Sequence, residues 1–168
     1  MEIFENTHTR DEAFYKEIYS HHYFKSKIYR FIDILMGISI LNGLVGLLFE
    51  VRLDYTVYGC FIFIILLRVI MYRRIVKVSM ARQKEVSTGG DILYTITVTE
   101  NSITHKSSLG SEYSIGFSSI KKVYQTKNYV ILQSGARQWY IFKKDGFVVG
   151  NCDDFTKFLE MKGYKIGR

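Results

Sequence analysis

The chain has 168 residues, which is enough for one or two small domains. Hydrophobic residues make up 48% of it and aromatic residues 15%, which excludes a disordered chain. Lys and Arg number 23 against 16 Asp and Glu, so the net charge is +7. Two cysteines, Cys60 and Cys152, are too few for a disulfide scaffold and argue against an oxidising compartment.

Residues 1–24 predict an N-terminal cytoplasmic segment built around one helix. Thr9-Arg-Asp-Glu12 matches a capping box, in which Thr9 is the N-cap and Glu12 occupies the third helical position. Phe14 and Ile18 then recur at helical spacing. We therefore expect a short amphipathic helix that leads toward the next segment.

Two long apolar runs, residues 31–49 and 55–72, dominate the segment 25–85. They are 19 and 18 residues long, close to the ~20 residues that a helix needs to cross ~30 Å of hydrocarbon. A pair of buried helices in a soluble bundle is the alternative, but a chain this short has little other mass to cover them. The pattern predicts a transmembrane hairpin followed by a basic stem.

The flanking charges give that hairpin an orientation. Basic residues stand before the first run and after the second, whereas the link between the runs carries one basic and two acidic residues. For a protein with these two spans, the positive-inside rule predicts that both termini are cytoplasmic. The basic residues are Lys25, Lys27, Arg30, Arg73, Arg74, Lys77, Arg82 and Lys84.

Asp33 and Arg68 are ionisable residues inside the two runs. In an antiparallel hairpin both lie within roughly 6 Å of the same membrane face, at ~1.5 Å per residue. Buried charge is often retained for ion or proton transfer, which gives an intramembrane enzyme or channel as one hypothesis. We favour the alternative, in which the two side chains pair or reach the interface and fix the register of the hairpin.

Small residues predict where the two helices of the hairpin approach each other. Ser39, Gly43 and Gly46 on the first helix are expected to face Gly59 on the second. This seam is interpreted first as packing within the hairpin and second as a contact in a homodimer.

Beyond residue 86 the pattern changes to short alternating segments. Tyr94–Thr99 alternates and is rich in β-branched residues, and further strands follow at regular intervals with turns between them. Asn151 offers an N-cap to a last helix over residues 153–161. Ile3 and Phe4 offer a brief strand that pairs with this domain. We expect an α+β membrane protein in which residues 86–168 form an antiparallel half-barrel of six or seven strands, closed by one helix.

The order of these segments resembles that of the YcxB-like bacterial membrane proteins. The most specific part of the resemblance lies in Ile141-Phe-Lys-Lys-Asp-Gly-Phe147, Gly150, Asp154-Phe155 and Phe158-Leu-Glu-Met-Lys162. It implies a bacterial cytoplasmic membrane protein whose C-terminal domain is similar to the pleckstrin-homology (PH) fold. The family commonly has a proline where this chain has Phe142, and the resemblance brings no catalytic residues.

Motifs that support covalent chemistry are absent from the sequence. Ser118-Ser-Ile-Lys121 formally matches Ser-x-x-Lys but leads into a strand instead of a helix. His21 and His22 are adjacent, so on a helix they point ~100° apart and serve one metal ion poorly. We therefore expect no catalytic residue, no metal site and no cofactor, and we do not expect an enzyme.

Basic residues are the remaining candidates for a binding site, either for anionic lipid or for a cytosolic protein. The alternative is general positive charge that fixes topology and solubility. Nucleic acid is not an expected partner, because an array of exposed aromatic side chains is missing. The candidates are Arg73, Arg74, Lys77, Lys121, Lys122, Lys143 and Lys144.

Two functional hypotheses follow from these features. In the first, the protein is a membrane-anchored, non-enzymatic binding or scaffold protein whose PH-like domain uses an open sheet edge or the groove beside its last helix. In the second, it is an immunity or regulatory subunit whose hairpin binds a membrane-active peptide or a transporter.

Overall fold

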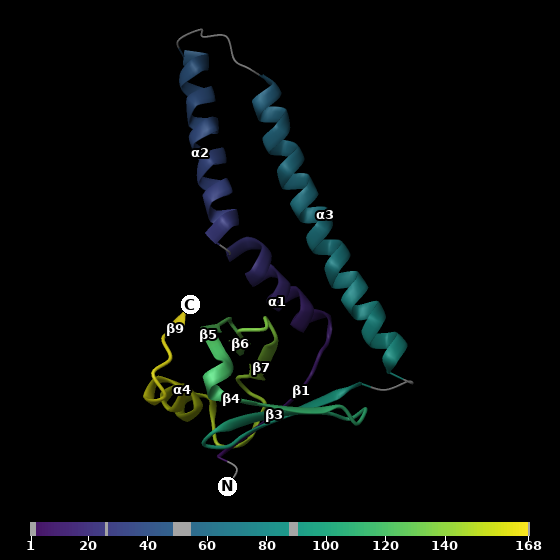
Figure 1. The fold of residues 1–168 in the computed structure, drawn as a ribbon. Coiled ribbons are helices and arrows are strands. Elements are labelled where there is room, and N and C mark those ends of the chain that lie inside the picture. The colour runs from purple at the N-terminus through teal and green to yellow at the C-terminus, as the bar shows by residue number, and fades with distance from the viewer. Residues whose placement is uncertain (1–2, 26, 49–54, 88–90, 168) are drawn as a thin grey trace. The chain divides into compact units, whose positions relative to one another are not determined.

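The computed structural model describes residues 3–25, 27–48, 55–87 and 91–167. The chain divides into two compact units, one formed by residues 12–82 and the other by residues 1–11 together with 83–168. The first unit is helical and the second is rich in strands, and each is described by itself below (Figure 1).

The helical unit contains α1 (Glu12–Lys25), α2 (Lys27–Leu48) and most of α3 (Tyr55–Val86). Within it, the Tyr19 hydroxyl on α1 lies 2.9 Å from the Ser79 hydroxyl on α3. The helix predicted near residue 9 exists, but it begins at Glu12, so the predicted N-cap Thr9 is wrong. Thr9 is instead the last residue of a strand and pairs with Leu93.

The predicted transmembrane hairpin is contradicted. Among the described residues, none of the helices combines the length and the apolar character that crossing a membrane requires. Asp33 and Asn42 in α2, and Arg68 in α3, lower the hydropathy of the two runs. The prediction of membrane spans at residues 31–49 and 55–72 is therefore wrong. The predicted class of membrane protein and the predicted two-span localisation in a bacterial cytoplasmic membrane are contradicted with it.

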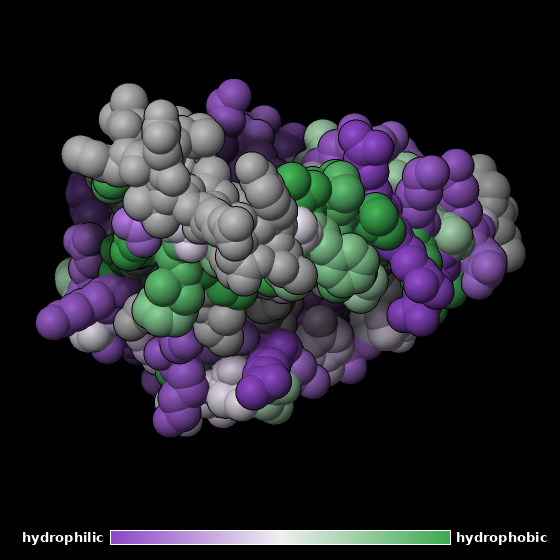
Figure 2. Space-filling view, turned by 90° about the horizontal axis from the view of Figure 1, so that it is seen from above, coloured by the Kyte–Doolittle hydropathy of each residue, from purple (hydrophilic) through white to green (hydrophobic). Residues whose placement is uncertain are grey.

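Helices α2 and α3 carry many large apolar side chains that are exposed within the structure. Phe31, Leu41 and Phe63 have 62%, 62% and 64% of their surface accessible. Figure 2 shows hydrophobic residues at the surface, beside hydrophilic ones. The two long helices therefore bury only part of their apolar surface against each other and α1.

The strand-rich unit contains two sheets and one helix. The larger sheet has the order β4 (Glu112–Gly116), β3 (Ser102–Ser107), β2 (Leu93–Val98), β1 (Phe4–Thr9) and β8 (Phe147–Val149), with all neighbours antiparallel. The smaller sheet has the order β7 (Trp139–Lys143), β6 (Tyr129–Ser134), β5 (Ile120–Gln125) and β9 (Ile166–Gly167). The helix α4 spans Cys152–Met161 (Figure 1).

The α+β class is confirmed by this arrangement, but the predicted single antiparallel half-barrel is wrong. The described strands form two separate sheets, because the short 3-10 helix Phe117–Ser119 carries the chain from β4 in one sheet to β5 in the other. The β5–β9 pair is parallel, not antiparallel. The brief strand predicted at Ile3 and Phe4 is confirmed in part: β1 begins at Phe4, extends to Thr9 and joins the larger sheet from before the three helices of the other unit.

Aromatic rings fill the core between the two sheets and α4. Phe155 on α4 lies 5.3 Å from the ring of Phe4 and 4.4 Å from that of Phe142, measured between centroids. Phe142 and Phe155 are fully buried and Phe4 is 5% exposed. Burying a side chain of this size contributes roughly 1.5–3 kcal/mol, so these three rings join β1, β7 and α4 into one core.

Helix α4 begins at an N-cap that the sequence predicts. The side chain of Asn151 accepts a hydrogen bond of 2.8 Å from the backbone N–H of Asp154. Beyond the helix, the Tyr164 hydroxyl donates a 2.6 Å hydrogen bond to the carbonyl of Phe117. These bonds fix both ends of the segment that covers the core.

Gly146 lies where β1 meets the turn between β7 and β8. Its carbonyl accepts a 2.8 Å hydrogen bond from Thr7, and a Cβ at Gly146 would lie 2.4 Å from the Thr7 carbonyl oxygen. We expect Gly146→Ala to lower the free energy of unfolding by about 2 kcal/mol, because the backbone must move apart. Urea unfolding followed by the fluorescence of Trp139, the single tryptophan, measures this.

Gly135→Ala is the matched control for that substitution. A Cβ at Gly135 would lie 3.6 Å from the nearest atom, Cγ of Lys121, which is ordinary contact. We expect a change within about 0.5 kcal/mol. Equal losses in the two variants would contradict the close approach of Gly146 to β1.

Candidate functional site

The edges of the two sheets differ in how they are closed. Strands β8 and β9 are edges of three and two residues, too short to accept a long partner strand. Strand β7 is longer, but its Ile141 is only 5% exposed. Among the described residues, β4 is the one edge strand of five residues in which every residue is exposed or half-buried.

Asn6 closes one end of the β7 edge. Its side-chain amide donates a 2.7 Å hydrogen bond to the Lys143 carbonyl, and its side-chain oxygen accepts a 3.1 Å bond from the Lys143 N–H. The carboxamide thus occupies both main-chain groups that a neighbouring strand would use. Asn6 is fully buried, so this closure belongs to the core of the unit.

The pairing of β4 with β3 shows which main-chain groups of β4 face away from β3. The Ser107 N–H donates to the Ser111 carbonyl at 2.9 Å, and the Phe117 N–H donates to the Asn101 carbonyl at 3.2 Å. Odd-numbered residues of β4 therefore bond to β3, because bonded and non-bonded pairs alternate along an antiparallel ladder. The N–H and carbonyl groups of Glu112, Ser114 and Gly116 consequently point toward the open edge.

A row of rings crosses the larger sheet and ends at β4. His8 on β1 stacks on Tyr94 at 5.9 Å, and Tyr94 lies 5.5 Å from His105 on β3. His105 stacks on Tyr113 of β4 at 4.7 Å with an interplanar angle of 23°. We call these four residues the ring ladder; it holds Tyr113 in a defined orientation although 40% of its surface is exposed.

Arg10 and Tyr140 complete the surroundings of the ring ladder. The Arg10 guanidinium lies 3.8 Å from the centre of the Tyr94 ring and 3.4 Å from Nε2 of His105. Tyr140 on β7 is fully buried and meets Tyr113 edge to face at 5.9 Å. The ladder is therefore supported from both sheets.

Burial keeps both histidines of the ladder neutral. Burial, the largest cause, together with charge repulsion from Arg10, His105 and Lys143, lowers the pKa of His8 to about 3. Burial and the charge of Arg10 lower the pKa of His105 to about 4, against a hydrogen bond to its own backbone that raises it. Burial also raises the pKa of Tyr113, so at neutral pH His8, His105 and Tyr113 carry no charge.

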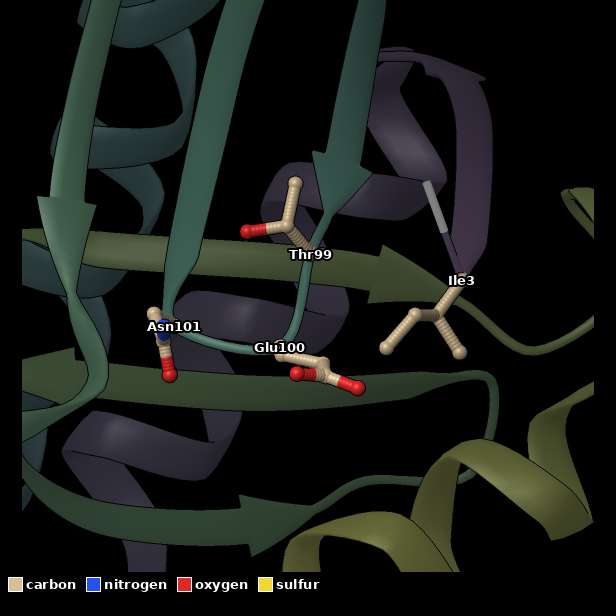
Figure 3. Close-up of a pocket in the computed structure, with 4 residues that line it drawn as sticks. All are labelled: Ile3, Thr99, Glu100 and Asn101. Carbon is tan, nitrogen blue, oxygen red and sulfur yellow. The ribbon is translucent and has the colours of Figure 1, made fainter. Parts of the chain in front are cut away.

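A cleft at the turn between β2 and β3 is the second candidate. It has a volume of about 510 Å³ and is lined by Ile3, Thr99, Glu100 and Asn101 (Figure 3). Two carbonyls of the turn are already bonded, since that of Glu100 accepts from Lys162 Nζ at 2.5 Å and that of Asn101 accepts from the Phe117 N–H. The β4 edge, in contrast, presents a continuous row of main-chain groups together with side chains.

The predicted basic residues of the strand-rich unit do not form one cluster. Lys122 pairs with Gln133 on β6, whereas Lys143 pairs with Tyr129, four residues away, which is about 13 Å at ~3.3 Å per residue. Lys121 is exposed beside Lys122, and Lys144 follows Lys143. Two pairs of lysines therefore lie at opposite ends of the smaller sheet.

Two of these lysines also have partners. Lys143 Nζ lies 3.3 Å from the Asp145 carboxylate, and Lys144 Nζ donates a 2.9 Å hydrogen bond to the Thr126 carbonyl. Arg73, Arg74 and Lys77 are exposed on α3, in the helical unit.

The structure brings Asp33 and Arg68 together. Arg68 Nη1 lies 2.7 Å from Asp33 Oδ1, and the guanidinium also lies over the rings of Phe24 and Tyr29 at 4.5 and 4.6 Å. The Arg68 side chain is 9% exposed and that of Asp33 is 43% exposed. This geometry is that of a cross-link between α1, α2 and α3, the structural role favoured for the pair.

The predicted seam of small residues is only partly assembled. Gly43 and Gly46 are buried and Ser39 is half-buried on α2. Gly59 on α3 is exposed, and a Cβ built there would lie in open space. Gly59 is therefore not at a close approach between helices.

Comparison with known proteins gives no relative: no family model, curated protein or solved structure matches the chain. The resemblance to YcxB-like proteins stays a prediction. Among the described residues, His, Cys, Asp and Glu do not gather into a group of three that could hold a metal ion.

Sequence reasoning missed the residues that make β4 a candidate site. His8 and His105 are far apart in sequence, and neither has a neighbouring motif. The alternation of Glu112–Gly116 indicates a strand, but it does not show whether the strand is central or at an edge. Only the strand order reveals that Tyr113 ends the ring ladder at an open edge.

The ring ladder predicts a specific loss of stability in acid. Both histidines have a folded pKa below the unfolded value of 6.5, so the unfolded chain binds more protons as the pH falls from 6.5 toward 4. Stability should therefore fall with pH, by up to about 1.4 kcal/mol per unit for each histidine. The measurement is urea unfolding at a series of pH values, followed by Trp139 fluorescence.

The control for this prediction is the double variant His8→Phe, His105→Phe, which keeps two rings in the ladder and removes the two titrating groups. Carboxylates titrate in both proteins, so the difference between the two curves isolates the histidines. Parallel curves between pH 6.5 and 4.5 would contradict the assignment.

Proposed function

We propose that the strand-rich unit is a non-enzymatic protein-binding module that takes an extended segment of a partner protein onto β4. The observation that carries the proposal is the open edge of β4, where Glu112, Ser114 and Gly116 present N–H and carbonyl groups that face away from β3. Strand addition satisfies such groups and supplies affinity that depends little on partner sequence.

Two side chains beside the edge supply specificity. Tyr113 and Ile115 alternate with the residues whose main-chain groups face the open edge. Their side chains lie on the face of the sheet that covers the core. A partner strand would place every second side chain against them, so we expect apolar or aromatic residues there. Tyr113 is already held by His105 and Tyr140, so little conformational freedom is lost on binding.

The charge distribution favours a protein segment over an anionic lipid surface as the ligand of this unit. The lysine pairs that were candidates for headgroup recognition lie at opposite ends of the smaller sheet, and two of the four lysines have partners. At β4 the Lys106–Glu112 ion pair of 3.2 Å leaves a balanced local charge. A neutral strand edge is suited to main-chain pairing.

The test uses Ser114→Pro and Ser114→Ala in the full chain, with a phage-displayed library of random peptides as the probe. Both variants lose the side-chain bonds of Ser114 to Thr104 and Ile103, but only Ser114→Pro loses the outward-facing N–H. We expect peptides selected on the natural chain to bind Ser114→Ala normally. Their affinity for Ser114→Pro should be at least about tenfold lower, a difference of ~1.4 kcal/mol.

Folding of both variants is checked by circular dichroism and by Trp139 fluorescence. Equal binding of the selected peptides by Ser114→Pro and Ser114→Ala would contradict strand addition at β4. Salt-sensitive binding of the full chain to anionic phospholipid vesicles, unchanged in Ser114→Pro and stronger than any peptide binding, would favour the lipid surface instead.

A further inference from the structure

The sequence of β4 is complementary to itself in an antiparallel arrangement. With Ser114 of one chain opposite Ser114 of a second copy, Glu112 faces Gly116 and Tyr113 faces Ile115. Residues directly opposite each other in an antiparallel pair lie on the same face of the sheet. The apolar positions of both copies therefore meet on one face, and Ser114 meets Ser114 on the other.

The alternation of outward-facing and inward-facing main-chain groups along β4, which we call its parity, selects this register. The groups that face the open edge belong to Glu112, Ser114 and Gly116, so a partner strand must place its own outward-facing residues opposite them. Pairing around Ser114 does this at all three positions and forms up to about six main-chain hydrogen bonds. A shift by one residue would place outward-facing groups opposite inward-facing ones and form none.

Charge and side-chain size agree with the same register. The one charged residue of β4, Glu112, lies opposite Gly116, so like charges do not meet across the two-fold axis. A shift by two residues in either direction keeps the parity but forms two bonded residue pairs instead of three. One such shift places Tyr113 opposite Tyr113 and leaves Gly116 beyond the partner strand, and the other places Ile115 opposite Ile115 and leaves Glu112 beyond it. The strand also contains no Lys, Pro or bulge, the devices by which edges resist pairing.

We propose that the segment paired with β4 is the β4 strand of a second copy of this chain, in a two-fold dimer centred on Ser114. This rests on the proposed function, because it names the partner of the same edge. The ring ladder then supports both halves of the interface, since each Tyr113 stacks on its own His105. A contact of two five-residue strands is small, so the dimer is expected to form reversibly and in a concentration-dependent way.

The first experiment cross-links the full chain through cysteine. In a Cys60→Ser, Cys152→Ser background, Ser114→Cys places two thiols on directly opposite residues whose Cα atoms are expected about 5.5 Å apart, within the range of a disulfide. Mild oxidation should give a disulfide-linked dimer. Ser118→Cys, on an exposed serine four residues further on, is the matched control and should stay monomeric.

The register is tested with two further single-cysteine variants in the same background. Glu112→Cys mixed with Gly116→Cys should give a heterodimer, and each variant alone should give at least about tenfold less dimer, because neither residue faces itself in this register. Gly116 has extended backbone angles, φ −78° and ψ 152°, that a cysteine adopts without strain.

Sedimentation of the uncross-linked chain separates this inference from the proposed function. A dimer that forms with increasing concentration in the natural chain and in Ser114→Ala, but not in Ser114→Pro, supports the second copy. A natural chain that stays monomeric, together with no cross-link at position 114, overturns it. If peptides then still bind in a Ser114→Pro-sensitive way, the proposed function stands with another partner; if they do not, both fall.

Discussion

The pairing of β1 between β2 and β8 is the constraint on which the strand-rich unit depends. Residues 4–9 enter this unit from before the three helices, and β1 lies between β2 and the short edge strand β8 of the larger sheet. Phe4, Thr7 and Thr9 favour a strand by propensity, but the polar Asn6 and His8 occupy buried positions. The strand forms because Phe4 enters the aromatic core and because Asn6 bonds to Lys143, 137 residues away.

Strand β1 also determines which edges of the two sheets are open. Asn6 closes the end of β7, and β1 itself fills the position beside β2 that would otherwise be a second long edge. His8 begins the ring ladder that ends at Tyr113. The N-terminal strand thus closes one side of the unit and supports the opposite side, where β4 remains without a second neighbour among the described residues.

Local features of the sequence predicted local structure well. The alternation of Tyr94–Thr99 corresponds to β2, and Asn151 is the N-cap of α4. The brief strand predicted at Ile3 and Phe4 also exists, as the start of β1. What the sequence did not predict depends on distant pairing: the extension of β1 to Thr9, the division into two sheets and the parallel pair β5–β9. The capping box at Thr9 failed for the same reason, because Thr9 pairs with Leu93 as the last residue of β1 and the helix begins only at Glu12.

The prediction made from the two long apolar runs was wrong for a different reason. Run length suggested membrane spans, although the described helices do not meet the length and hydropathy that a span requires. Asp33 and Arg68, treated as exceptions within apolar runs, are joined in an ion pair at 2.7 Å that also involves aromatic rings of α1 and α2. The ionisable residues therefore define contacts between helices of the unit.

The candidate site was hidden from the sequence because an edge is a property of strand order. Glu112–Gly116 alternates as a central strand does. Its main-chain groups at Glu112, Ser114 and Gly116 face an open edge because, in the part of the chain that the structure describes, β3 is its one neighbouring strand. An open edge normally favours aggregation, so its lack of Lys, Pro or a bulge is consistent with a partner that covers it. The neutral histidines behind Tyr113 add no charge near the edge, so the recognition proposed there would rest on main-chain geometry and on the side chains of Tyr113 and Ile115.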